Sequence, residues 1–350
     1  MPRFTVGVEE EFYLVDRRTR RLAPVTRELV GSVQEALTGT VSHELALCQV
    51  ETSTSVCSSL GELRRAVAEQ RTQLRRVAAE HGRGVLCSAT PILEAPGPPP
   101  LADSPRYRAM SQDFRALLDD QGVSGCHVHI GVPSREIAVL AVNHLRPWLP
   151  VLLAITTNSP FCAGRDTGYQ SWRHQLWSRW PTAGPPPIVG SVREYDETVA
   201  GLRRAGAAAD ERDVYWFVRA SPTWPTIEVR VADVLPTVDE VAGYAGLVRA
   251  LVRRAIDDVT AARPAPRVPE AVLRAEMWRA ARDGVRGSPG PTHHDLIETV
   301  RPELELAGDQ DAVERFAAAL DEHGTGADRQ RAAHRRGGSL TAVVDELLLR

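Results

Sequence analysis

The sequence predicts an α+β protein built on an antiparallel or mixed sheet. Segments with the two-residue alternation of strands lie in the first two thirds of the 350-residue chain, and segments with helical spacing fill the last third. The two kinds do not alternate regularly, which argues against a doubly wound parallel sheet. No soft linker marks a boundary, so residues 1–350 are expected to form a single domain with a helical part from about residue 268.

Strands are predicted where aliphatic, aromatic and β-branched residues alternate with polar ones between turn residues. The first predicted strand ends at the turn Asp16-Arg17-Arg18. The predicted strands and extended runs cover residues 4–15, 44–52, 84–90, 125–132, 214–219 and 226–231.

Helices are predicted where apolar residues recur at helical spacing behind a capping residue. Ser59-x-x-Glu62 and Thr237-x-x-Glu240 have the pattern of capping boxes, and Ser134 is the N-cap of a further helix. The predicted helices cover about 59–81, 134–147 with a continuation to 158, 237–262, 270–282, 293–306, 310–322 and 340–349.

Two segments show no clear period. Residues 95–100 are rich in proline, which predicts a stiff surface loop. Residues 159–190 combine Pro, Gly, Trp and Arg, and a stretch of this length without regular structure is usually functional. We expect residues 159–190 to form an ordered loop that covers the active site.

The basic residues of the chain are unusual, because all 42 are arginines and none is a lysine. A P-loop and a Schiff-base mechanism both require lysine, so both are excluded. Any phosphate must therefore be bound by arginines, metal ions or backbone amides. The net charge is −3, so no overall basic field attracts nucleic acid, and no nucleic-acid partner is expected.

The five cysteines indicate a reduced protein and a cytoplasmic location, because their number is odd and no pair has C-x-x-C spacing. A catalytic cysteine is disfavoured, since only Cys126, beside His127, has an activating neighbour. The N-terminus lacks a signal-peptide pattern. Charged residues and prolines break the apolar stretch 137–155, so no membrane partner is expected.

Four predicted strands carry polar residues at positions i and i+2, which places both members of each pair on one face of the strand. Aliphatic residues occupy most of the opposite faces. Each pair by itself also fits a solvated sheet face or a structural ion pair. Together they predict a sheet with an apolar back and a carboxylate-lined front. The pairs are Glu9 with Glu11, Gln49 with Glu51, His127 with His129, and Glu228 with Arg230.

The residue types on this front indicate a metal-assisted reaction of a phosphate compound. Carboxylates with few nitrogen ligands favour Mg²⁺ or Mn²⁺ over zinc. Acids and arginines without lysine suit a nucleoside triphosphate held through metal ions. Glu10 is the exception, because it falls in the apolar row, where it needs an arginine partner or a bulge.

Motifs spread over nearly the whole chain carry a resemblance to a known family. They are Gly7–Phe12, Gln49–Thr52, Gly125–Pro133, Asn158–Phe161, Gly164–Tyr169, Trp180–Thr182, Gly184–Pro187, Ile227–Val231, Asp233, Pro236–Asp239, Met277–Arg282 and Gly326–Arg331. Together they resemble the carboxylate–amine ligases of the type-2 glutamate–cysteine ligase family, relatives of glutamine synthetase.

The resemblance implies an ATP-dependent ligase that activates a carboxylate as an acyl phosphate, which an amine then attacks. The nominal pair is glutamate and cysteine, giving γ-glutamylcysteine. The implied fold is a curved, mainly antiparallel sheet with helices packed behind it. Its concave face would hold ATP and two or three Mg²⁺ or Mn²⁺ ions. The expected partners are small-molecule carboxylates and amines, namely amino acids, and a homodimer is allowed.

The resemblance also implies roles for individual acids and one histidine. Metal binding would fall to Glu9, Glu11, Glu51, His127 and Glu228. It would also fall to Glu44, but strict alternation places Glu44 and Glu51 on opposite faces unless a bulge intervenes.

Arginines complete the expected site. Arg230 would contact the γ-phosphate and, with Glu228, act in catalysis. The candidates for binding the substrate carboxylates rest mainly on the arginine-rich loop, and they are Arg165, Tyr169, Arg173 and Arg219.

Other functions remain open at this point. The same scaffold could join a different carboxylate and amine in specialised metabolism. A metal-dependent phosphohydrolase would use the same acids and histidines. A catalytically silent binding protein is disfavoured, because every expected metal position carries a competent ligand.

Overall fold

The predicted α+β class is confirmed by the computed structural model, which describes residues 4–93, 100–286 and 290–350. A seven-stranded sheet has the order β2-β3-β1-β5-β9-β8, and β4 also pairs with β1. All these pairings are antiparallel. The strands are β1 (Val6–Asp16), β2 (Thr40–His43), β3 (Gln49–Ser53), β4 (Arg83–Leu86), β5 (Gly125–Gly131), β8 (Val218–Ala220) and β9 (Thr226–Asp233).

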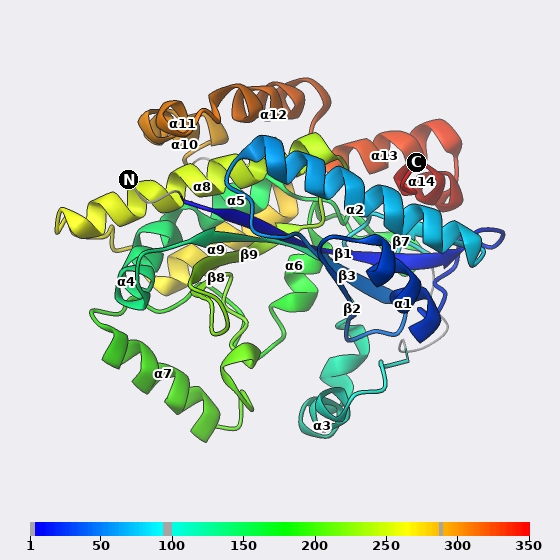
Figure 1. The fold of residues 1–350 in the computed structure, drawn as a ribbon, viewed down its shortest axis with the longest axis horizontal. Helices are drawn as coiled ribbons and strands as arrows, with labels where there is room; N and C mark the ends of the chain where they lie inside the picture. Colours follow the sequence, from blue (N-terminus) through cyan, green and yellow to red (C-terminus); the bar gives the residue numbers. More distant parts are fainter. Residues whose placement is uncertain (1–3, 94–99, 287–289) are drawn as a thin grey trace.

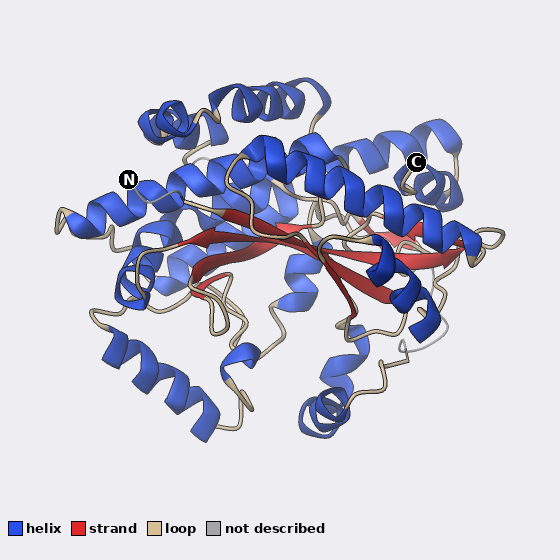
Figure 2. Cartoon of the chain, viewed as in Figure 1, coloured by secondary structure: helices blue, strands red, loops and turns tan. Residues whose placement is uncertain are grey.

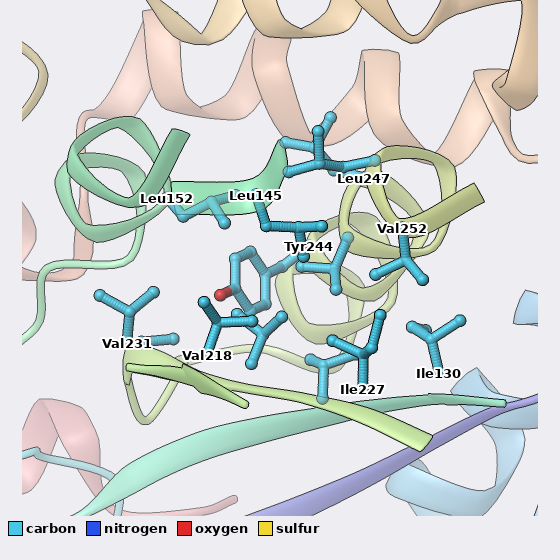
Figure 3. Close-up of a cluster of buried hydrophobic side chains, with 14 of the residues drawn as sticks. Ile130, Leu145, Leu152, Val218, Ile227, Val231, Tyr244, Leu247 and Val252 are labelled. Carbon is cyan, nitrogen blue, oxygen red and sulfur yellow. The ribbon is translucent and has the colours of Figure 1, made fainter. Parts of the chain in front are cut away.

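Helices cover the apolar face of this sheet, as Figures 1 and 2 show. They are α2 (Leu60–Glu80), α4 (Arg135–Leu145), α5 (Leu149–Ile155) and α8 (Val238–Thr260). Ile130, Ile227 and Val231 project from the sheet toward Tyr244 of α8 and Leu145 of α4 (Figure 3). The three strand residues come from the alternate positions that were predicted to face the core, and all three are almost fully buried.

The apolar stretch Arg135–Ile155 belongs to this core. By length and composition it could cross a membrane, but 67% of its most apolar window is buried inside the protein. A 3₁₀ turn at Arg146–Trp148 separates α4 from α5, because Pro147 lacks the amide proton that a continuous helix needs. The burial of the stretch Arg135–Ile155 is typical of core helices.

The last third of the chain is helical, as predicted. Helices α10 to α12 lie beyond α8, on the side away from the sheet, whereas α3 and α7 lie on the sheet's other side (Figure 1). The remaining helices are α1 (Arg27–Ala36), α3 (Pro105–Phe114), α6 (Trp172–Trp177), α7 (Val192–Arg204), α9 (Glu270–Asp283), α10 (His293–Thr299), α11 (Arg301–Ala307), α12 (Gln310–His323), α13 (Gly326–Gly337) and α14 (Leu340–Leu347).

Several local predictions need correction. Helices α1, α3, α7 and α13 were not predicted. The expected extended run 44–52 consists of the connection between β2 and β3, at 44–48, and most of β3, and the expected strand 84–90 ends at Leu86. The segment 159–190 contains the two-stranded β6 (Phe161–Cys162) and β7 (Arg165–Asp166) sheet and α6. The predicted loop 95–100 lies, except for Pro100, outside the described residues.

Capping follows the sequence closely at α8 and less so at α2. Thr237 and Glu240 form the complete capping box predicted there. At α2, the Ser59 hydroxyl accepts from the Glu62 amide as expected, but the Glu62 carboxylate accepts from the amide of Ser58. Both helices are therefore fixed at their N-terminal ends.

Glu10 has the arginine partner that its place in the apolar row requires. Its carboxylate accepts hydrogen bonds from Arg71 of α2 at 2.5 and 3.1 Å, and it is 1% exposed. Arg71 also donates to the carbonyls of Leu235 and Pro236, which follow β9. This buried ion pair therefore joins β1, α2 and the end of β9 behind the polar face of the sheet.

Candidate active site

A cavity of about 280 Å³ lies on the polar face of the sheet. Strands β1, β3, β5, β8 and β9 contribute its charged floor, and α3, α6 and the turn between β8 and β9 contribute its walls. The polar members of all four predicted strand pairs line this one cavity. The predicted polar front of the sheet is thus a pocket and not an open solvated surface.

Strand register brings the acids and histidines together. Glu9 of β1 lies opposite His127 of β5, and Glu11 lies opposite Glu51 of β3. His129 of β5 lies opposite Glu228 of β9. Directly opposite residues in an antiparallel pair have their Cβ atoms about 4.5–5.5 Å apart. The two side chains of each pair are therefore close enough to bind the same metal ion.

These side chains form three overlapping groups, in each of which the potential ligand atoms lie within 4.8 Å of one another. The groups contain every residue that was expected to bind metal, and His129 in addition. They are Glu9, Glu51 and His127; Glu11, Glu44 and Glu51; and Glu9, His129 and Glu228.

The donor set suits divalent cations. The Nε2 atoms of His127 and His129 are buried without a hydrogen-bond partner. The Nδ1 atom of His129 lies 2.9 Å from the Thr226 hydroxyl, which orients its Nε2 toward Glu9, 3.4 Å away, and Glu228, 4.0 Å away. Such support of the second ring nitrogen is typical of histidines that bind metals.

The close packing of several carboxylates in the cluster also favours binding of a cation. Burial, followed by repulsion from Glu44, Glu9 and Glu11, holds the pKa of Glu51 well above its usual range. Burial also raises the pKa of Glu11. Burial opposes ionisation of Glu9 as well, but the contacts of its carboxylate with His127 and His129 outweigh burial and lower its pKa. A bound divalent ion would stabilise all of these carboxylates in the ionised form.

The position of Glu44 in the cluster does not follow from strand alternation. It follows the last residue of β2, where the chain turns toward β3, so it is free of the strand's alternation. Its carboxylate accepts from the Leu45 amide at 2.8 Å. A hairpin connection, and not the expected bulge, thus lets Glu44 and Glu51 share the cluster.

Glu228 and Arg230 leave β9 on the same face, as predicted, while Val229 packs behind them in the core. The Glu228 carboxylate accepts hydrogen bonds from Arg230 and from Arg219, the latter at 2.7 Å. Burial would raise the pKa of Glu228, but the charges of Arg230 and Arg219 hold it well below its usual range. The pair is therefore an ion pair inside the pocket, next to His129.

Of the four residues expected to bind the substrate carboxylates, one lines the pocket and three do not. Arg219 lines the pocket, whereas Arg165, in β7, is exposed and does not. Tyr169 accepts a hydrogen bond from the indole of Trp278, also outside the pocket lining. Arg173 is buried beneath the floor, with its Nη2 atom 3.4 Å from the Arg230 carbonyl oxygen.

Gly125 makes room for Arg173. A Cβ atom at Gly125 would lie 2.3 Å from the Arg173 Nη2 atom, so any larger residue would displace this guanidinium. The Gly125 amide also donates to Glu11 at 2.6 Å. Burial raises the pKa of Glu11, and the charge of Arg173 opposes this rise, so Arg173 contributes to the electrostatics of the site without lining it.

Several pocket residues were missed by sequence reasoning. Arg106 and Arg212 line the pocket, and each pairs with an aspartate at its edge. Arg106 lies in α3, which carries no strong periodic signal, and Arg212 lies in a short 3₁₀ turn. The segment 159–190 contributes Trp177 and Trp180, which form part of one wall.

A pH-dependent contribution to stability arises beside this wall, at His174. Its ring packs against Phe217 with ring centroids 5.0 Å apart. Burial, with the nearby charge of Arg173, lowers its pKa to about 3. In the unfolded chain its pKa is about 6.5. The unfolded state therefore binds a proton between these values that the folded state does not, so stability is lost as the pH falls below about 6.5.

Replacing His174 with phenylalanine is expected to remove about 2 kcal/mol of the decrease in unfolding free energy between about pH 7.5 and pH 5.0. Denaturant unfolding at both pH values measures this difference. The same substitution at the exposed His323 should leave the decrease unchanged. Identical pH dependence in wild type and His174→Phe would show that another group is responsible.

Comparisons with known proteins come from sequence families and from solved structures. The model of the family described as "Glutamate-cysteine ligase family 2" matches residues 5–346. A protein of Saccharopolyspora erythraea named "Putative glutamate--cysteine ligase 2-1" is 46% identical over 358 residues, which cover 99% of this chain and 94% of that protein. A protein of Mycobacterium sp. (strain KMS) named "Putative glutamate--cysteine ligase 2-2" is 43% identical, covering 97% and 96% of the two chains.

Two solved structures share the fold. Glutamate–cysteine ligase from Francisella tularensis, in complex with AMP, superimposes with a TM-score of 0.67 at 15% identity, covering 99% of this chain and 88% of the other. A bifunctional glutathione synthetase from Pasteurella multocida gives a TM-score of 0.72 at 14% identity, and this chain spans 51% of its length. At such identities the likeness shows the fold alone.

Proposed function

Because this chain belongs to glutamate–cysteine ligase family 2, it is a carbon–nitrogen ligase, and we propose that it uses ATP to join L-glutamate to L-cysteine. The observation that carries the proposal is the convergence of acids, histidines and four arginines in one cavity. The relatives' names supply the nominal substrates, which the geometry alone does not specify. We further propose that residues 1–350 act as one catalytic domain in the cytoplasm.

The reaction would proceed in two steps. First, a substrate carboxylate oxygen bonds to the γ-phosphorus of ATP, and the bond from that phosphorus to ADP breaks. Then the amine nitrogen bonds to the carbonyl carbon of the acyl phosphate, and inorganic phosphate leaves. The amine loses a proton in this second step.

Arg230 and Arg219 are suited to the transferring phosphoryl group. Both guanidinium groups are buried and fixed by Glu228, so they need no rearrangement when charge develops. The Nε atom of Arg230 has no hydrogen-bond partner and can donate to a phosphate oxygen. We assign Arg230 to the γ-phosphate and Glu228 to fixing its orientation.

The acidic cluster would hold Mg²⁺ or Mn²⁺, with Glu9, Glu11, Glu44, Glu51, His127, His129 and Glu228 as the ligands. Divalent ions there would neutralise the phosphates and bridge them to the protein. His127 and His129 would present their free Nε2 atoms as ligands.

Three aromatic residues, Trp177, Trp180 and Tyr215, form a wall of the pocket that can exclude water. Trp177 packs edge to face against Trp180 and against Tyr215, and the Arg230 guanidinium lies 5.8 Å from the Trp177 ring centroid. An acyl phosphate must be kept from water, and these rings form an apolar side of the pocket. Half-buried Arg106 and exposed Arg212 also line the pocket, and they are candidates to bind the substrate carboxylates.

The test is ADP release with Mg²⁺ or Mn²⁺, ATP, L-glutamate and L-cysteine, with each component omitted in turn. We expect ADP formation that requires both amino acids and the divalent ion, and a product with the mass of γ-glutamylcysteine. ADP formation that proceeds equally without an amine would instead identify a phosphohydrolase. Product from another amino acid or amine, but not from this pair, would identify a ligase of different specificity.

A further inference from the structure

Two adjacent histidines and an aspartate converge far from the pocket, on the outer helical layer. His293 and His294 are the first residues of α10, and Asp321 lies near the end of α12. The Nε2 atom of His293 lies 3.2 Å from Asp321 Oδ1, and that of His294 lies 3.1 Å from Asp321 Oδ2. Their potential ligand atoms all lie within 4.8 Å of one another.

We propose that His293, His294 and Asp321 form a second metal site, which binds a zinc-like transition-metal ion and fastens α10 to α12. The proposal is independent of the ligase reaction. Two imidazoles and one carboxylate are a ligand set for zinc and its neighbours, whereas the carboxylate-rich pocket suits Mg²⁺ or Mn²⁺.

The spacing of the donor atoms fits such an ion. Zinc binds histidine nitrogen and carboxylate oxygen at about 2.0–2.2 Å in tetrahedral geometry, so neighbouring ligand atoms lie about 3.3–3.5 Å apart. The Nε2 atoms of His293 and His294 lie 3.2 and 3.3 Å from the same oxygen, Asp321 Oδ1, which is close to this value before any adjustment. The fourth position would be open to water.

The competing explanation is a set of hydrogen bonds between the imidazoles and the carboxylate. The two rings lie with centroids 4.1 Å apart and planes 37° from each other. Neutral imidazoles can donate these hydrogen bonds to Asp321 without a metal ion, so both explanations are compatible with neutral rings. The two explanations differ in one respect, because only the metal site binds a zinc ion through both rings.

Accessibility and location also suit an added structural ion. The His294 side chain is 61% exposed and that of Asp321 50%, so an ion can enter from solvent, while His293 is 10% exposed and holds one side of the site in place. Helix α10 has seven residues, and α12 packs against α8. Figure 1 shows α10 to α12 on the side of α8 away from the sheet. Linking α10 to α12 would stabilise this layer without touching the pocket.

The test counts zinc bound by the whole protein in excess Mg²⁺, which competes for the oxygen-rich pocket. We expect His294→Ala to bind one zinc equivalent fewer than wild type and to lose a zinc-dependent rise in the unfolding temperature. Asp321→Asn should weaken binding by about tenfold or more. Both changed side chains are half exposed or more, so folding should be preserved.

His323 offers a matched control, because it is an exposed histidine of α12 beside Glu322 with no second imidazole near it among the described contacts. His323→Ala should keep the full zinc count and the full zinc-dependent stabilisation. The proposal is overturned if His294→Ala binds as much zinc as wild type, or if His323→Ala loses as much zinc as His294→Ala does. Activity with Mg²⁺ should be the same in both variants.

Discussion

Glutamine in place of Glu228 is expected to leave a folded protein whose amine-dependent ADP formation falls by roughly 10²–10³-fold or more. Glutamine keeps the size of the side chain and one oxygen acceptor for Arg230 or Arg219. It removes the charge that fixes both guanidinium groups and one ligand of the group formed with Glu9 and His129. High concentrations of Mg²⁺ or Mn²⁺ should restore part of the activity by occupying the weakened site.

The measurement is ADP release with and without amine, with circular dichroism as the test of folding. Glu80→Gln is the matched control, since Glu80 also pairs with an arginine, at 2.7 Å, but is exposed on α2. That variant should keep full activity. Arg230→Lys should fail like Glu228→Gln, because an ammonium group cannot reproduce a two-pronged contact. Normal amine-dependent turnover of Glu228→Gln at ordinary Mg²⁺ would show that Glu228 and Arg230 form only a structural ion pair.

The second large effect concerns stability. Replacing Arg71 with methionine is expected to lower the free energy of unfolding by about 3–5 kcal/mol, because it leaves the Glu10 charge buried without its partner. The Arg71 side chain is 7% exposed and that of Glu10 1%, so water cannot replace the lost hydrogen bonds. The carbonyls of Leu235 and Pro236 lose their donor as well. Denaturant unfolding measures the change.

A double variant separates the ion pair from simple packing. Arg71→Met combined with Glu10→Leu should recover a large part of the lost stability, since no buried charge remains. Arg76→Met is the control on the same helix, because Arg76 pairs with Glu80 at the surface, and it should change stability by about 1 kcal/mol or less. A double variant no more stable than Arg71→Met would mean that the guanidinium's backbone contacts, and not its charge, matter most.

The alternation of residues along single strands was readable from the sequence. It placed Glu9 with Glu11, and Glu228 with Arg230, on polar faces, and the structure keeps each pair together in the pocket. It also identified Glu10 as a carboxylate in need of an arginine. These predictions succeeded because the two faces of a strand follow directly from the geometry of the extended backbone.

Helices were harder to predict from the sequence where their apolar stripe was short. Helices α1, α3, α7 and α13 were missed, and with α3 the pocket arginine Arg106. In α13 the buried positions are small or polar residues, such as Ala327 and Gln330, so burial leaves no hydrophobic period to detect.

Only the tertiary structure decided which polar residues meet. His129 stands opposite Glu228 because of the register between β5 and β9, and Glu44 joins the cluster through a hairpin connection. The partner of Glu10 proved to be Arg71, some sixty residues away in sequence. Local backbone geometry sets the direction of a side chain, but the pairing of strands and the docking of helices depend on the packing of the whole chain, to which each segment contributes only weakly.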